Sequence, residues 1–468
     1  MRRRLLVGLG VIAAAAALGV AAALATGVMA PSWGWAMGVG SPPPIVVGLL
    51  HSQTGPQAIG EKALLDAEIL ALEEINARGG VAGRPVVWVV KDGRSDASTF
   101  ATEARRLIDD DKASVLFGCW TADGRKAVQS VVEERGNMLV FPANYEGMER
   151  SPRTIYTGGV ANQSVVPAMR WCFESLKARR FFVVGTEEIW SRSVSEIAED
   201  AARATGAEVV GRHFLPMTGG DVEAAVAAVR AAKPDVVVNM LVGDSNVPFL
   251  AASRRAGLTP EGLPMVFFGI AEDEIRRIPP GDVAGHYAGM AYFQSLDRAE
   301  NRDFVRRFRA RYGEDRTTSD PIVAAYNGVR LWAQAANEAG TADATVVLVH
   351  FDRQSLDAPE GIVTIDPDTR VVWRPFLIGR ARPDGQFDIA WSLPKPIRPS
   401  AYVGTRSRGQ WRAFLADLRG RRAGPPPAPG PDAAPAPKAE GPPPGAGESP
   451  IPPPRRPGPR TTETGEPA

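Results

Sequence analysis

The stretch 114–147 constrains the fold more than any other part of the chain. An apolar run at 115–117 is followed by a turn, a helical pattern, and a second apolar run at 138–141 with a turn of its own. Strand, turn, helix, strand and turn in this order are typical of a parallel sheet, where ligands bind at the carboxyl ends of the strands. We therefore expect the segments 119–122 and 143–145 to lie near the mouth of one pocket.

The same alternation of strands and helices recurs on both sides of this stretch. Continuous apolar runs, typical of strands buried on both faces of a sheet, are separated by segments with helical spacing of apolar residues. The sequence therefore predicts an α/β fold with two doubly wound lobes. The predicted strands outside 114–147 include 45–50, 86–90, 181–185, 208–210, 235–240 and 265–268.

The two ends of the chain differ in composition from its body. Three arginines at positions 2–4 precede an uncharged, alanine-rich run that reaches position 30, which predicts a signal peptide. The run is long enough to span a bilayer, so an uncleaved signal anchor is the alternative. Residues 31–43 read as a linker, and the proline-rich segment 424–468 as a disordered tail. Either form of the signal predicts a periplasmic or extracytoplasmic body, and the uncleaved form would anchor it to the membrane.

Several function classes are disfavoured by what the sequence contains. The 54 basic and 53 acidic residues balance, so no electrostatic footprint for nucleic acid is present. The four histidines show no metal-ligand spacing, and no nucleophile elbow, phosphate loop or dinucleotide fingerprint occurs. We expect no enzyme activity, no metal and no cofactor. The two cysteines, Cys119 and Cys172, are expected to be separate buried thiols.

A series of short motifs, taken together and in order, resembles one known family over residues 44 to 400. The chain is similar to the urea and short-chain-amide substrate-binding proteins of ABC transporters, and to the amide-sensing regulator of amidase operons. The motifs are G-C-W-T at 118–121 with R-K-A-V at 125–128, P-A-N-Y-E-G at 142–147, S-P-R-T-I-Y-T-G at 151–158, N-M-L-V-G-D-S-N-V at 239–247, A-G-H-Y-A at 284–288, Y-F-Q-S-L-D at 292–297, T-S-D-P at 318–321, D-A-P-E-G at 357–361 and D-G-Q-F-D-I at 384–389.

The resemblance implies a type I periplasmic binding protein, a Venus flytrap of two lobes joined by three crossovers. The first lobe would comprise 44–156 plus 285–342. The second would comprise 157–284 plus 343–400. Residues 401–423 would form a C-terminal extension.

The resemblance also implies a ligand site in the loops at the strand ends. Trp120 matches the aromatic residue that packs on the flat ligand, whereas Ala122 replaces a serine that hydrogen-bonds the amide. Glu188 and Trp190 occupy the positions of two tyrosines. The expected ligand-binding residues are Ser52, Trp120, Thr121, Ala122, Ala143, Tyr145, Glu188, Trp190, Asp244 and Glu272.

These replacements leave two interpretations of the ligand. Glu188 near Asp244 and Glu272 would make an acidic pocket suited to a cationic guanidine or amine. Alternatively, Glu188 points to solvent and the ligand is urea or a short-chain amide.

The implied function is an exported receptor that captures a small molecule and delivers it to ABC permease subunits. A membrane-tethered sensor or regulatory subunit of the same fold is one alternative, favoured by the long apolar start and the proline-rich tail. A structural relative that binds no ligand is another, suggested by the changed pocket.

Overall fold

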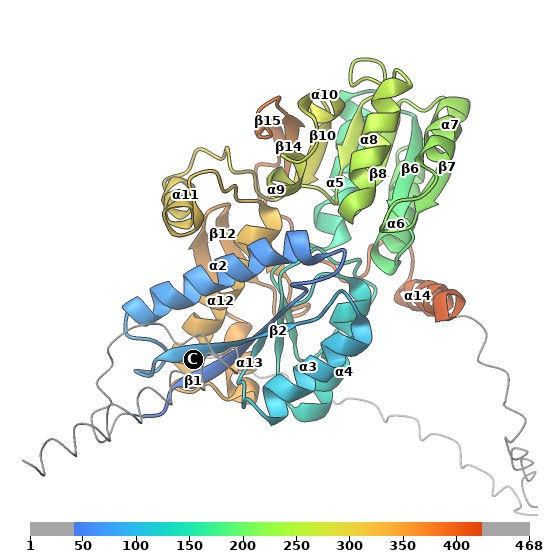
Figure 1. Ribbon diagram of the computed structural model, residues 1–468. Coiled ribbons are helices and arrows are strands. Elements are labelled where there is room, and N and C mark those ends of the chain that lie inside the picture. The colour runs from blue at the N-terminus through green and yellow to red at the C-terminus, as the bar shows by residue number, and fades with distance from the viewer. Residues whose placement is uncertain (1–41, 424–468) are drawn as a thin grey trace, which may run out of the picture. The chain divides into compact units, whose positions relative to one another are not determined.

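A five-stranded parallel sheet forms the core of the first lobe (Figure 1). The computed structural model describes residues 42–423, so the predicted signal segment 1–30, the linker up to residue 41 and the tail 424–468 lie outside the described residues. The strand order is β2-β1-β3-β4-β5, and every neighbouring pair is parallel. The strands are β1 (Ile45–His51), β2 (Val86–Asp92), β3 (Leu116–Gly118), β4 (Leu139–Phe141) and β5 (Thr154–Tyr156).

Helices cover both faces of this sheet because its strands are apolar on both sides. Ile45, Val47 and Leu49 of β1 pack into a core with one pair of helices, and Leu50 packs into a second core with the other pair. The first pair is α2 (Ala58–Ala77) and α12 (Asp320–Ala339), and the second is α3 (Ala97–Asp109) and α4 (Ala122–Arg135). This confirms the doubly wound arrangement expected from continuous apolar strands.

A seven-stranded mixed sheet forms the core of the second lobe, in the order β15-β14-β10-β9-β8-β6-β7. The first five strands in the chain are parallel, and the last two form an antiparallel hairpin beside β10. The strands are β6 (Arg180–Thr186), β7 (Glu208–Leu215), β8 (Val236–Met240), β9 (Met265–Phe267), β10 (Tyr287–Met290), β14 (Leu377–Ala381) and β15 (Phe387–Ser392).

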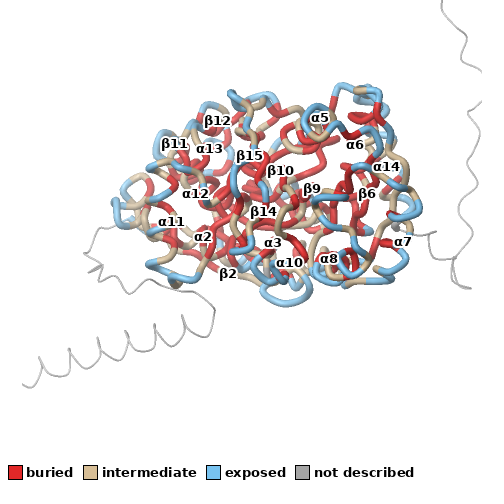
Figure 2. The backbone as a smooth tube through the Cα atoms, turned by 90° about the horizontal axis from the view of Figure 1, so that it is seen from above, coloured by how far each residue is buried: buried red, intermediate tan, exposed pale blue. Residues whose placement is uncertain are grey.

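Alternating side chains of β6 show that this sheet is also covered on both faces. Phe181 and Val183 join a core with two helices on one side, whereas Phe182 and Val184 join a core with two helices on the other. The inner strands of both sheets accordingly run through the buried interior in Figure 2, whereas the edge strands β7 and β15 are partly exposed. The helices are α5 (Val165–Ser175) with α6 (Ile189–Ala204), and α7 (Val222–Ala232) with α8 (Asn246–Arg255); shorter turns are η1 (Ala161–Gln163), η2 (Gly243–Ser245), α9 (Glu272–Ile275) and α10 (Pro280–Val283).

The chain passes between the two sheets three times, as the fold class requires. It leaves the first sheet after β5, leaves the second after β10, and returns to the second between β13 and β14. The segment between the last two passages contains α11 (Ala299–Tyr312), α12, α13 (Ala344–Phe351) and a small antiparallel sheet, β11 (Ser355–Ala358), β12 (Gly361–Ile365) and β13 (Val372–Trp373).

The lobe boundaries expected at 285 and 342 differ from this arrangement. β10 pairs with β9 and β14, so residues 287–290 belong to the second sheet. Phe351 and Val372 pack into the first core with α12, so 344–373 belongs with the first lobe. Strand pairing and core packing between distant segments decide both boundaries.

A C-terminal helix, α14 (Arg408–Ala423), packs on the second lobe. Trp411 is fully buried in the core that contains α5 and α6. Arg406, just before the helix, forms ion pairs with Glu196 and Asp200 of α6. At the other end, Arg419 lies 3.2 Å from Glu149 in the first lobe. The segment expected as an extension is therefore packed against both lobes.

None of the helices between residues 42 and 423 is long and apolar enough to cross a membrane.

A buried ionic clamp joins β1 to α2. Nε2 of His51 lies 2.9 Å from Glu68, and its Nδ1 lies 3.3 Å from Glu61. Burial lowers the pKa of His51, but the two carboxylates outweigh burial and raise that pKa from 6.5 to about 10. His51 is therefore a structural residue, as expected for a histidine without metal-ligand spacing.

The substitution His51→Gln should destabilise the fold by about 3 kcal/mol, because it leaves two buried carboxyl groups without their cation. A histidine whose pKa is raised on folding stabilises the protein fully below its unfolded pKa, and that contribution is lost as the pH rises through about 10. Urea unfolding at pH 6, 8 and 10 should show the deficit of the variant shrinking with pH.

The partly exposed His350 provides the matched control, because it lies 3.9 Å from a single carboxylate. His350→Gln should change the free energy of unfolding little at any of these pH values. A deficit of His51→Gln that is the same at pH 6 and pH 10 would contradict the clamp.

Candidate functional site

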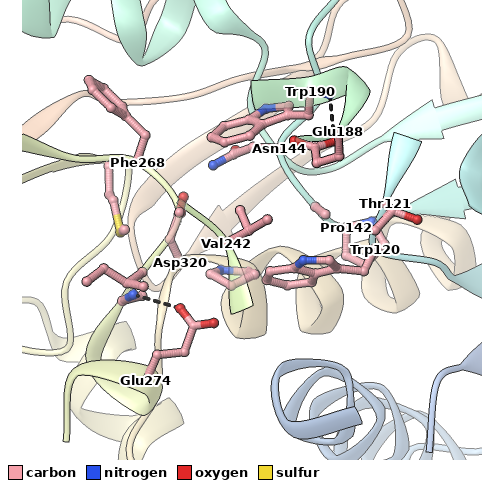
Figure 3. Close-up of a pocket in the computed structure, with 16 residues that line it drawn as sticks. Trp120, Thr121, Pro142, Asn144, Glu188, Trp190, Val242, Phe268, Glu274 and Asp320 are labelled. Atoms are coloured by element: carbon pink, nitrogen blue, oxygen red, sulfur yellow. Dashed lines mark hydrogen bonds between the residues drawn. The ribbon is translucent and has the colours of Figure 1, made fainter. Parts of the chain in front are cut away.

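A cavity of about 620 Å³, the first chamber, opens between the two sheets where their strands end (Figure 3). Its walls come from the turns after β3 and β4 in the first lobe and from the turns after β6, β8 and β9 in the second. The lining residues are Trp120, Thr121, Pro142, Ala143, Asn144, Glu188, Trp190, Val242, Phe268, Gly269, Ile270, Ala271, Glu274, Met290, Asp320 and Pro321. The structure thus brings together the strand-end loops of both lobes.

Two tryptophans provide flat walls on opposite sides of the first chamber. Trp120 follows β3 in the first lobe, and Trp190 lies in the first turn of α6 in the second. Figure 3 shows the two indoles above and below the cavity. An aromatic face attracts flat groups and cations.

The turn that carries Trp120 has an unusual backbone. Cys119 has φ +68°, and Gly118 has φ +137°. A Cβ on Gly118 would lie 2.0 Å from the carbonyl oxygen of Leu50, so only glycine fits there. The sharp turn leaves Cys119 buried and Trp120 half-buried beside the cavity. Both Cys119 and Cys172 are free buried thiols, as expected.

The first lobe supplies two neutral polar groups. Thr121 caps α4, and its hydroxyl oxygen accepts a hydrogen bond from Gly124 N at 3.2 Å. Asn144 accepts from Gly159 N at 2.8 Å, which fixes its amide oxygen. The amide nitrogen of Asn144 has no hydrogen-bond partner in the part of the chain that the structure describes, and it points into the chamber (Figure 3). It can donate to a ligand.

Two of the three carboxyl groups in the first chamber are held by protein partners. Glu188 caps α6 and accepts hydrogen bonds from the backbone N–H groups of Trp190, at 2.7 Å, and Ser191. Asp320 begins α12 and pairs with the buried Arg374. Their negative charge is therefore largely compensated within the protein.

The third carboxyl group, Glu274, has a pKa raised well above its usual range. Its Oε2 accepts a hydrogen bond from Ala271 N at 3.2 Å, drawn as a dashed line in Figure 3. Burial, with a further contribution from Asp273, raises the pKa of Glu274 to about 8. A neutral Glu274 can donate a hydrogen bond to a ligand, and an ionised one can attract a cation.

Five expected site residues line the first chamber, and one lines a neighbouring cavity. Trp120, Thr121, Ala143, Glu188 and Trp190 contact the first chamber. Asp244 lines a second chamber of about 610 Å³, which shares Trp120, Val242, Ile270 and Glu274 with the first.

The other four expected residues lie outside both chambers. Ser52 is buried, and its backbone N–H donates to Glu61. Ala122 is buried in the core that contains α5 and α6. Tyr145 stacks on Tyr156, with ring centroids 4.2 Å apart.

Glu272 is buried and accepts a hydrogen bond from Gln294 N at 2.7 Å. Burial raises the pKa of Glu272 to about 8. The acidic pocket considered as one interpretation is not formed as described, because Glu188 caps a helix, Asp244 lines the second chamber and Glu272 lies in the core.

The sequence did not point to Glu274 or Asp320. Asn144 lies in the segment 143–145 that was expected at the mouth of the pocket, although it was not among the expected ligand-binding residues. Asp320 lies in the T-S-D-P motif, where a proline in the first turn marks the start of a helix. Glu274 carries no such signal, because its place depends on the position of α9 against α2. Within residues 42–423 no cluster of three or more His, Cys, Asp or Glu is arranged to hold a metal ion.

Comparisons with known proteins place the chain among binding proteins. A family described as periplasmic binding protein domain matches residues 45–408. Leu/Ile/Val-binding protein homolog 7 of Brucella melitensis is 25% identical over 325 residues, which cover 65% of this chain and 79% of that protein. A 114-residue stretch is 38% identical to limonene hydroxylase of Geobacillus stearothermophilus, covering 24% of this chain and 21% of that protein, so the chain spans about a fifth of this relative's length.

Solved structures show the same fold. A solute binding protein of an ABC transporter from Rhodopseudomonas palustris, solved with 3,4-dihydroxybenzoic acid, superposes with a TM-score of 0.68 at 20% identity, covering 76% of this chain and 98% of that chain. At this identity the likeness concerns the fold alone. Since the family match at 45–408 extends over most of the chain, the protein belongs to the periplasmic binding protein family, with the type I fold.

Proposed function

We propose that this protein is an extracytoplasmic solute-binding protein that captures a planar nitrogen compound between its lobes and delivers it to an ABC permease. The placement of Trp120 and Trp190 on opposite walls of the first chamber carries this proposal. Each indole belongs to a different lobe, so a flat ligand between them contacts both lobes at once.

The charges around the chamber favour an N–H-bearing ligand over a carboxylate. Among the described residues that line the first chamber there is no lysine, arginine or histidine. A carboxylate there would meet Glu188, Glu274 and Asp320 without a cation of its own. An amide or urea group can donate N–H groups to these oxygens and accept from the amide of Asn144, and an amidinium group can donate to the same oxygens.

The two indoles favour aromatic members of this chemical class. An aryl amide or amidine offers a flat ring to the faces of Trp120 and Trp190, whereas urea or a short-chain amide has no ring to stack on them. Urea and acetamide belong in the test as the smallest members of the class.

Ligand capture would favour the closed arrangement of the lobes. A ligand that touches both indoles binds the closed form better than the open form, and that difference shifts the population toward the closed form. The closed form is then the one that a permease can distinguish.

Isothermal titration of the intact chain with benzamide, benzoate, acetamide and urea tests the ligand class. Benzamide should bind at least tenfold more tightly than benzoate, its isosteric carboxylate, because the chamber offers no cation. Acetamide and urea should bind more weakly than benzamide because they lack the ring. Benzoate binding more tightly than benzamide would contradict the proposal.

Replacing either Trp120 or Trp190 should weaken benzamide binding by about tenfold, because aromatic side chains in a closed pocket contribute much of the affinity. The variants are Trp120→Leu and Trp190→Leu, measured by titration. Trp391→Leu is the control: Trp391 lies on β15, outside both chambers, and should leave the affinity unchanged. Equal affinities in all three variants would place the ligand elsewhere.

The pH dependence of binding should reveal the ionisation of Glu274. Because its pKa is about 8, Glu274 is protonated at pH 6.5 and ionised at pH 9.5. The affinity for the cation benzamidinium should therefore rise over this interval, whereas that for neutral benzamide should stay level or fall. Glu274→Gln, which resembles the protonated form, should flatten both profiles. A rise for benzamidinium that persists in Glu274→Gln would assign the titration to another group.

A further inference from the structure

The second chamber extends the candidate site beyond the indole of Trp120. It has a volume of about 610 Å³ and shares Trp120, Val242, Ile270 and Glu274 with the first chamber. The two chambers are therefore neighbours, separated by the side chains that line both of them.

The walls of the second chamber also come from both lobes. Gln57, just before α2, belongs to the first lobe, and its Nε2 lies 3.7 Å from Sδ of Met217 in the second. The buried Oε1 of Gln57 has no hydrogen-bond partner in the described part of the chain. This polar atom lies on an element that lines the chamber and can accept a bond from a ligand N–H.

Arg277 gives the second chamber a cation that the first lacks. Its side chain is exposed, lines the chamber, and forms no salt bridge with any residue between 42 and 423. Arg277 also borders a hollow of about 890 Å³ whose lining includes Lys62, Arg276 and Arg316, with Asp273 as its one acidic residue. Arg316 is paired with Asp66 at 2.8 Å, so the positive potential beside the chamber comes mainly from Lys62, Arg276 and Arg277.

Acidic groups oppose this potential only in part. Asp244 is exposed on the wall of the second chamber, and Glu274 lies between the two chambers. Because burial and Asp273 raise the pKa of Glu274 to about 8, this residue is largely uncharged near pH 7. Near Arg277 the positive charges therefore outnumber the negative ones.

We propose that the second chamber is a subsite for a carboxylate, carried on a short tail of the same ligand whose flat amide group lies between Trp120 and Trp190. This inference rests on the proposed function and narrows it. The ligand class becomes an aryl or acyl amide with a terminal carboxylate. The first chamber has no basic side chain to pair with the carboxylate, whereas the second has Arg277. The carboxylate therefore lies in the second chamber, and this fixes the orientation of the ligand. Arg277 is the specificity-determining residue, through a charge-assisted hydrogen bond.

Three probes that differ only at the tail test the subsite on the intact chain. Hippurate carries the carboxylate, hippuramide is its neutral amide, and N-(2-aminoethyl)benzamide carries an ammonium group in a similar place. Hippurate should bind about tenfold more tightly than hippuramide, as expected for one charge-assisted bond, and the ammonium probe should bind no better than hippuramide.

The variant Arg277→Gln should abolish the preference for hippurate over hippuramide. Arg255→Gln is the matched control: it removes one exposed arginine of the same lobe, paired with Glu223 and outside both chambers, and should leave the preference intact. Retention of the preference in Arg277→Gln would overturn the role of Arg277.

The outcomes separate this inference from the proposed function. If benzamide binds but hippurate binds no more tightly than hippuramide, the inference of a carboxylate subsite is wrong and the proposed function stands. If the ammonium probe binds most tightly, Asp244 rather than Arg277 determines which tail charge the second chamber prefers, and the inference is also wrong. If neither benzamide nor any of the three probes binds, the proposed function itself fails.

Discussion

The direction of parallel strands is the constraint on which the site depends. All strands of the first sheet, and five of the second, are parallel to their neighbours, so their carboxyl ends collect at one edge of each sheet. Loops at these edges carry Trp120 and Asn144 in one lobe and Glu188 and Trp190 in the other. The chambers form because both edges border the same cleft. The helices on the outer faces hold the sheets in shape and leave the loops free to differ.

The acidic residues near the cleft illustrate how structure changes the meaning of a sequence. Glu188 caps a helix, Asp320 pairs with Arg374, and Glu274 has a pKa raised to about 8. Three carboxyl groups therefore line a chamber with much less negative charge than a count of acidic residues suggests. What remains is a set of oxygen acceptors, with hydrogen-bond donors from Asn144 and from protonated Glu274, between two aromatic faces. Such a surface suits a neutral or weakly basic planar group.

Local patterns in the sequence predicted most of the fold but only part of the site. Runs such as 45–50 and 181–185 are apolar enough to identify buried strands, and residues directly after a strand, such as Thr121 and Ala143, do line the first chamber. Tyr145 lies only two residues beyond Ala143, yet it points into the core and stacks on Tyr156. Adjacency in the sequence does not determine the direction of a side chain in an irregular loop.

Features that depend on distant segments could not be predicted in this way. The place of β10 is decided by pairing with β9 and β14, and the place of Glu274 by the approach of the two lobes. The same is true of α14, whose buried Trp411 gave no sign in the sequence of which lobe it would cover.

The position of α14 has a consequence for the motion of the lobes. Arg406 is tied to α6 of the second lobe, whereas Arg419 is tied to Glu149 of the first, and the backbone of Ala401 accepts a hydrogen bond from Met148 N. Any rotation of one lobe against the other must stretch these links or carry them along. If the lobes open and close as proposed, the ionic contacts of the C-terminal segment contribute to the balance between the two forms. Affinity for the solute is then set partly by residues that never touch it.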